Sequence, residues 1–187
     1  MGIYKDVMGT LVRVLAADNI DNSTKQSWQK LIDAELSSGG QGAGISVRDK
    51  FDYDCCLYAL LHREMASAHW DVLVAKYSTH KANKVGAIGR LVARMVSPAP
   101  PLFIYKALTA WAIPKLKGMQ SGKRSTDMIV LPAEFYDMNT WDLAGSPERT
   151  RRNWRGGILK RLEKLEEQAV IHATEIFDRE EIFVDAA

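Results

Sequence analysis

Apolar residues recur at intervals of three and four along almost every segment of this chain. That spacing gives an α-helix one buried face, whereas a strand would alternate every second residue. Residues 128–131 are the only run with the character of a strand, and four residues are too few to define one. The sequence therefore predicts an all-α protein with at most one short strand. The predicted helices cover residues 4–15, 23–36, 47–62, 70–77, 81–97, 102–113, 133–144 and 147–176.

The length of 187 residues fits one domain, or one domain that carries an insertion. Hydrophobic residues make up 47% and charged residues 26%, which excludes a disordered chain. The expected parts are an N-terminal helical part of the core at 1–79, a basic insertion or arm at 80–126, and a C-terminal part at 127–187. The last part is expected to hold a helix-turn-helix and a final helix.

The cysteines and the apolar runs of the sequence indicate in which cellular compartment the protein is expected. The adjacent Cys55 and Cys56 cannot build a disulfide framework, and the four histidines have no zinc-finger spacing to them. We expect both cysteines to pack in the core, in a reducing cytosol. No signal peptide is evident, and the most apolar run, Leu102 to Ile113, is too short to span a bilayer. A cytoplasmic protein without a membrane partner is predicted.

Basic residues are concentrated in two zones although the net charge is only +2. Residues 72–126 hold ten basic residues and no acidic one, and residues 148–161 hold six basic and one acidic. An anionic partner is the natural interpretation, and nucleic acid is the commonest one. The alternative is a solvated face balanced by the acidic ends of the chain. Candidates for contact with phosphate or with a polymerase are Lys81, Lys84, Arg90, Arg94, Lys123 and Arg124.

The second basic zone falls in a helix–turn–helix pattern. Residues 133–144 predict one helix with Phe135, Met138, Trp141 and Leu143 facing inward. Gly145 supplies the turn, because glycine adopts a positive φ at little cost. Ser146 is a suitable N-cap and Pro147 a suitable first residue for the next helix. In such a motif the second helix places its first side chains on base edges in the major groove.

Double-stranded DNA is therefore the predicted partner of this second helix. Arginine side chains suit guanine, and Asn153 can pair with adenine through two hydrogen bonds. The alternative is an ordinary helical hairpin with a solvated arginine face. Gly156 and Gly157 are costly inside a helix, which predicts a bend or a close backbone approach there. The predicted DNA-binding residues are Ser146, Arg149, Thr150, Arg151, Arg152, Asn153, Arg155 and Lys160.

Beyond the glycines, apolar residues step by four and three from Ile158 to Ile176, which is a heptad seam. Packing within the same chain is the favoured interpretation, and a dimer seam is the alternative. Trp154 is expected to lean inward with this seam, and His172 on it is expected to be a hydrogen-bonded core histidine. The loop at 118–125 lacks the spacing of a phosphate-binding loop. No catalytic constellation stands out, so neither an enzyme nor a cofactor is predicted.

Three features together resemble the Q antiterminators of lambdoid phages, in the branch similar to region 4 of sigma factors. The first is the run from Asp54-Cys55-Cys56-Leu57 to Trp70-Asp71-Val72-Leu73-Val74-Ala75-Lys76-Tyr77. The second is Gly145-Ser146-Pro147-Glu148-Arg149-Thr150 followed by Asn153, Ile158 and Leu162. The third is the acidic C-terminal helix that follows. The stretch 80–126 departs from the family as an insertion, and Arg151 stands where such helices usually have an apolar residue.

The resemblance implies a mechanism without catalysis. The protein would bind DNA near a phage late promoter and load onto RNA polymerase that is paused there with its sigma factor. It would then suppress pausing and termination in the cytoplasm of the bacterial host, with nascent RNA as a further partner. The alternatives are another helix-turn-helix protein, such as a repressor or a small terminase subunit, or an all-helical protein-interaction module.

Overall fold

A computed structural model describes residues 6–17, 47–115 and 129–183. Within these residues the chain is all-helical and has no strand, which confirms the predicted fold class. The predicted helix at 23–36, together with Lys123 and Arg124, lies outside the described residues. The α-helices are α1 (Val7–Ala17), α4 (Val47–Glu64), α5 (Ser67–Tyr77), α6 (Lys81–Arg94), α7 (Pro101–Ala112) and α8 (Glu148–Arg179).

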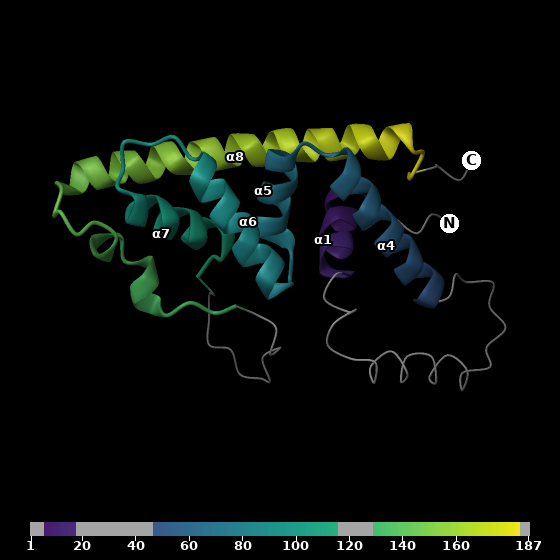
Figure 1. Cartoon of the computed structure of the whole chain (residues 1–187), viewed down its shortest axis with the longest axis horizontal. Coiled ribbons are helices and arrows are strands. Elements are labelled where there is room, and N and C mark those ends of the chain that lie inside the picture. Colours follow the sequence, from purple (N-terminus) through teal and green to yellow (C-terminus); the bar gives the residue numbers. More distant parts are fainter. Residues whose placement is uncertain (1–5, 18–46, 116–128, 184–187) are drawn as a thin grey trace.

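Helix α8 is the spine of the molecule. It has 32 residues, and Figure 1 shows it running the whole length of the structure with the other helices on one side of it. Helix α5 lies at the centre and packs on both α6 and α8, while α7 packs on α8 nearer its N-terminal end. Helices α1 and α4 pair with each other toward the C-terminal end of α8. One side of α8 is therefore covered and the opposite side faces away from the other helices.

The covered side of α8 is the heptad seam. Ile158, Leu162, Ala169 and Ile176 are all buried, and they belong to one hydrophobic cluster with residues of α1, α4, α5, α6 and α7. The favoured interpretation, packing within the chain, is confirmed. Because those side chains already contact the same chain, a dimer cannot form through this seam without opening the core. No helix in the described residues is long and apolar enough to cross a membrane.

Helices α6 and α7 belong to the same core as the other helices. Ile88, Leu91, Phe103 and Leu108 are buried, and both helices pack on neighbours outside the segment 80–126. The predicted basic amphipathic helix is present, but Val85, expected on its apolar side, is 57% exposed. The limits proposed for the three parts of the chain remain a prediction.

The expectation that both cysteines are buried is wrong. Cys55 and Cys56 are exposed on α4. Helical periodicity explains this, because Asp54, Leu57 and Leu61 lie on the buried face and the two residues after Asp54 rotate away from it. Asp54 is itself buried and accepts a hydrogen bond from the arginine at position 13 of α1 at 2.7 Å.

The prediction of an α-helix at 133–144 is also wrong. The segment forms two short 3-10 turns, η1 (Ala133–Tyr136) and η2 (Met138–Thr140), separated by the extended residue Asp137. The Asp137 carboxylate accepts a hydrogen bond from the Asn139 backbone, and such local bonds compete with an α-helix. Trp141 is buried as expected, whereas Leu143 is 89% exposed. Residues 133–144, directly before the turn at Gly145, therefore form no α-helix, and the expected helix-turn-helix is not formed by this segment.

Candidate nucleic-acid interface

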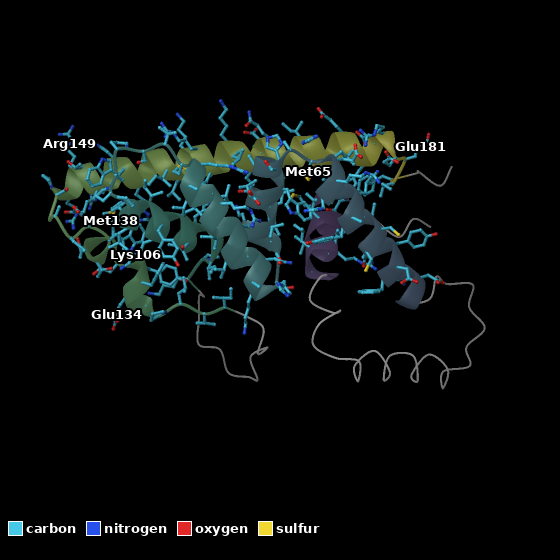
Figure 2. The ribbon with its side chains drawn as sticks, in the orientation of Figure 1. Met65, Lys106, Glu134, Met138, Arg149 and Glu181 are labelled. Carbon is cyan, nitrogen blue, oxygen red and sulfur yellow. The ribbon has the colours of Figure 1, made fainter. Side chains whose placement is uncertain are left out.

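The N-terminal half of α8, residues 148–161, forms a basic surface at one end of the molecule. Figure 2 shows Arg149 at this end and Glu181 at the other. The side chains of Arg149, Arg152, Asn153 and Lys160 are exposed. Arginines in the first turns add to the partial positive charge that backbone N–H groups create at a helix N-terminus. The surface can therefore attract an anion both through its side chains and through its backbone.

Three of the predicted DNA-binding residues are less exposed to solvent than Arg149, Arg152, Asn153 and Lys160. Ser146, Thr150 and Arg151 are half-buried. Arg151 lies two and three turns before the buried Ile158 and Leu162, so it points toward the covered side of α8. Its Nε is buried and has no hydrogen-bond partner among the described residues. This position is the one at which the resembled family has an apolar residue.

The start of α8 is fixed by Asp142. The turn uses Gly145 with a φ of 69°, as predicted, but the helix begins at Glu148 and Pro147 occupies the N-cap without a side-chain hydrogen bond. The prediction that Ser146 is the N-cap of this helix is wrong. The Ser146 backbone N–H donates a hydrogen bond to Asp142 Oδ2 at 2.7 Å. The Asp142 carboxylate also accepts from the Ala144 backbone at 3.0 Å. Hydrogen bonds led by that from the Ser146 side chain lower the pKa of Asp142.

An aromatic cluster holds this end of α8 against the body of the protein. The indole Nε1 of Trp141 donates to the Phe135 carbonyl at 2.7 Å, so η1 and the turn are tied together. The Phe103 ring of α7 contacts both Trp141 and Trp154 edge to face, with ring centroids 5.4 and 5.5 Å apart. The guanidinium of Arg155 lies 5.8 Å from the Trp141 ring centroid. This end of α8 is therefore packed against α7 and the turn before it.

Two open hollows flank the basic surface, one on each side of α8. The first, of about 340 Å³, lies between α8 and the segment that joins α6 to α7. The second, of about 550 Å³, lies between α8 and η2. Nothing in the sequence indicates that residues 97 and 98 lie beside the arginine-rich helix, because that contact joins segments about fifty residues apart in the chain. The first hollow is lined by Ser97, Pro98, Thr150, Asn153, Trp154, Gly157 and Arg161.

Gly156 and Gly157 neither end α8 nor sit against another segment. The helix continues through both, and a Cβ built at either glycine would meet no atom within 4 Å. The predicted close backbone approach is therefore absent at both glycines within the described residues. The two glycines leave a gap in the side chains on the outer surface of the basic half.

The charged groups of this surface have few partners in the chain. Arg152 pairs with Glu148 at 2.6 Å across one helical turn, and both side chains are largely exposed. Such an exposed pair is weak and easily exchanged for another anion. Arg149 and Lys160 form no ion pair with any residue that the structure describes. These cations are available to an external anion.

The first basic zone behaves differently, because most of its described cations contact the chain itself. Lys84 is buried, and its Nζ donates to the Lys76 carbonyl at 2.9 Å near the end of α5. Arg90 and Arg94 both pair with the buried Asp71 at 2.8 Å. A phosphate contact by Arg90 or Arg94 stays a prediction, whereas the buried ammonium of Lys84 is poorly placed for one. Lys81 is exposed.

Two histidines that the sequence did not connect lie together. His69 Nδ1 of α5 is 3.1 Å from His172 Nδ1 of α8, so His172 is hydrogen-bonded as expected, although it is half-buried rather than in the core. Burial, with a smaller effect of His172, lowers the pKa of His69. No group of three metal-binding side chains occurs within the described residues. The pair is a contact between two helices.

Comparisons with protein-family models, with curated proteins and with solved structures give no match to this chain.

Proposed function

We propose that this protein binds double-stranded DNA through the basic N-terminal half of α8. The observation that carries the proposal is that Arg149, Arg152 and Lys160 are exposed together on the N-terminal half of one helix. Among the described residues, the only ion pair that these three side chains form is the weak one between Arg152 and Glu148. The proposal uses α8 itself and requires no helix before the turn. Lys84 and Arg151 are not part of the proposed surface.

Two kinds of contact follow from the chemistry of these side chains. Cations such as Arg149 and Lys160 suit phosphate oxygens, and phosphate contacts fix position without reading sequence. Asn153 is exposed between them, and its amide can donate to and accept from adenine in the major groove. The N-terminus of α8 can approach a phosphate through its backbone N–H groups.

The first test measures affinity for a random DNA duplex at several salt concentrations. Each phosphate contact releases counterions, so loss of one contact lowers the salt slope by about one. Arg149→Gln is expected to weaken binding and flatten the salt dependence. Arg63→Gln is the matched control, since Arg63 is 73% exposed on α4. If both variants bind as the unchanged protein does, Arg149 does not contact phosphate.

The second test asks whether Asn153 reads a base. A duplex selected from a random pool supplies the specific target. Asn153→Ala should lose about 1–3 kcal/mol on the selected duplex and much less on random DNA. An equal loss on both duplexes would show that Asn153 only positions the helix.

The narrower function that we propose is transcription antitermination, and it is supported by the sequence resemblance to the Q antiterminators. The protein would load onto paused RNA polymerase and its sigma factor near a late promoter in the bacterial host, and nascent RNA would be a further partner. Transcription in vitro past a terminator is the test, with read-through expected to rise when the protein is added. DNA binding without any read-through would favour a repressor or a small terminase subunit instead. Absence of DNA binding would favour a protein-interaction module.

A further inference from the structure

The outer side of α8, opposite the buried seam, carries a regular stripe of residues. They recur three, four or seven residues apart, which places them on one side of a helix with 3.6 residues per turn. All are exposed except Thr174, which is half-buried. Among the described residues, Figure 1 shows no other helix on this side of α8. The outer stripe consists of Arg149, Asn153, Gly156, Lys160, Glu167, Ile171, Thr174 and Asp178.

The outer stripe is complementary to itself when it is turned end to end. The midpoint of α8, which runs from Glu148 to Arg179, falls between Glu163 and Lys164. Four of the five mirrored pairs at equal distances from this midpoint have opposite charge or complementary size, and the fifth pairs two uncharged polar residues. The matched pairs are Arg149 with Asp178, Asn153 with Thr174, Gly156 with Ile171, Lys160 with Glu167, and Glu163 with Lys164.

We propose that a second copy of this chain docks on the outer stripe, with the two α8 helices antiparallel about a twofold axis at their midpoints. A twofold contact uses the same patch on both copies, so each residue must suit the residue at the mirrored position. Lys160 of one copy then lies level with Glu167 of the second copy, and Arg149 lies level with Asp178. At 1.5 Å per residue, the contact from Arg149 to Asp178 extends over about 44 Å.

Charged side chains of the outer stripe that have no ion-pair partner in the described chain support a second copy as the partner. Arg149, Lys160, Glu167 and Asp178 form no ion pair or side-chain hydrogen bond with the rest of the described chain. By contrast, Glu166, one residue away and half-buried, is bonded by both Lys76 and Tyr77 of α5. Glu166 therefore has its partners within the chain, and the charges on the outer stripe have theirs at mirrored positions of a second copy.

Shape gives a second, independent argument. Ile171 is 53% exposed and is the large apolar side chain of the outer stripe. Gly156 has empty space where its Cβ would be. In the antiparallel pair the Ile171 side chain of each copy lies over Gly156 of the other, where the missing side chain leaves room. This contact occurs twice, once on each side of the axis.

The contact rests mainly on exposed ion pairs, so its strength depends on salt. Exposed pairs contribute little individually and are screened within about 10 Å at 0.1 M ionic strength. Self-association is therefore expected at low salt and to weaken as salt is added. The inference does not rest on the proposed DNA binding. It shares Arg149, Asn153 and Lys160 with that surface, so DNA and a second copy would compete where both bind.

The experiment measures self-association by sedimentation velocity at low salt, without nucleic acid, for the unchanged chain and for charge reversals. Lys160→Glu and Glu167→Lys each turn two attractive contacts into repulsive ones, and each is expected to weaken the dimer about tenfold. The double variant exchanges the two charges and restores both contacts, so its affinity should return to that of the unchanged chain. The new carboxylate at position 160 lies one helical turn from Lys164, and the new ammonium at position 167 lies one turn from Glu163. Because both neighbours have the opposite charge, neither change should unfold α8.

Controls and a second variant keep the result decisive. Glu134→Lys and Lys115→Glu make the same changes in net charge at exposed sites away from the stripe, and both should dimerise normally. Gly156→Leu should keep its helical circular dichroism spectrum but lose the dimer, because the new side chain fills the space for Ile171. A chain that stays monomeric at low salt would overturn the proposal. So would a dimer that the single reversals leave intact or that the double reversal does not restore.

Discussion

Single charged side chains hold α5 and α6 together at the edge of the core. The side chain of Asp71 is only 3% exposed and accepts from Arg90 and Arg94, both at 2.8 Å. A buried carboxylate needs such partners, because removing it from water is costly unless its charge is compensated. The two arginines keep their outer atoms in solvent, so the cluster closes the edge of the core.

Asp71→Asn should therefore destabilise the protein. Hydrogen bonds to charged groups contribute about 1.5–3 kcal/mol, and the amide can neither balance two guanidinium groups nor accept from both equally well. Urea denaturation should show a loss of stability in this range. Glu134→Gln makes the same chemical change at an exposed side chain and should have almost no effect. Equal stability of the two variants would mean that the arginine cluster is not structural.

Lys84 gives a pH-dependent prediction. Burial lowers its pKa from 10.5 to about 8, so between these values the folded protein binds fewer protons at this site than the unfolded chain. Stability therefore rises with pH through this window, and the unfavourable contribution of the charged form is fully present below it. Lys84→Met removes the titration. The stability of the unchanged protein relative to this variant should increase from about pH 8 to pH 10, and a constant difference would contradict the assignment.

Among the helices, α8 tolerates two adjacent glycines because its length and its packing do not depend on them. The helix is held by its buried seam, and the side chains missing at Gly156 and Gly157 would have pointed to open space. Helices in proteins owe most of their stability to such packing rather than to intrinsic propensity. The glycines therefore lower the stability of the helix without interrupting it.

Gly157→Ala should stabilise the protein. Glycine is about 0.8–1 kcal/mol less favourable than alanine inside a helix, and the added methyl group meets no atom within 4 Å. Thermal unfolding at low protein concentration should show the gain. Gly89→Ala in α6 has the same open surroundings and should behave alike. A loss of stability at Gly157 alone would indicate that its backbone is close to a segment outside the described residues.

The element before α8 shows how local hydrogen bonds prevent a helix. Residues 133–140 contain Asp137, Asn139 and Thr140. Side chains of these types can form hydrogen bonds with the nearby backbone when the chain is not helical, and those bonds compete with an α-helix. The Thr140 hydroxyl donates to the Asp137 carbonyl at 2.9 Å. The apolar spacing of Phe135, Met138 and Trp141 is helical, but only Trp141 becomes fully buried.

Across the molecule as a whole, α8 is the element that joins the two ends of the core. It contacts α1, α4, α5 and α7, whereas α1 and α4 lie at one end and α7 lies nearer the other. A buried residue near its middle should therefore affect the stability of the entire described fold.

Leu162→Ala tests this role of α8. Leu162 is fully buried, so truncating it should cost about 2–5 kcal/mol in the free energy of unfolding. Leu143→Ala is the matched control, because Leu143 is 89% exposed and its loss should change stability little. Tryptophan fluorescence and circular dichroism should report one coincident transition in both variants. Separate transitions would mean that the two ends fold independently.

The helical class and most of the helices could be predicted from the order of the residues alone. Apolar spacing located α4, α5, α6 and α7 and the inner face of α8, because burial of one helix face requires a period near 3.6 residues. The turn at Gly145 could also be predicted, since a positive φ there favours a residue without a side chain. The exposure of Arg149 and Arg152 follows from the same period, because Ile158 faces inward.

Which charges are available to a partner depends instead on how the helices pack. The ten cations of 72–126 are equivalent in the sequence, but Lys84, Arg90 and Arg94 contact α5. Periodicity tells which face is apolar and does not tell which distant carboxylate or carbonyl a lysine will meet. The contact between His69 and His172 and the position of Ser97 and Pro98 beside α8 have the same origin. Each depends on contacts between segments far apart in the chain, and a local pattern carries no record of them.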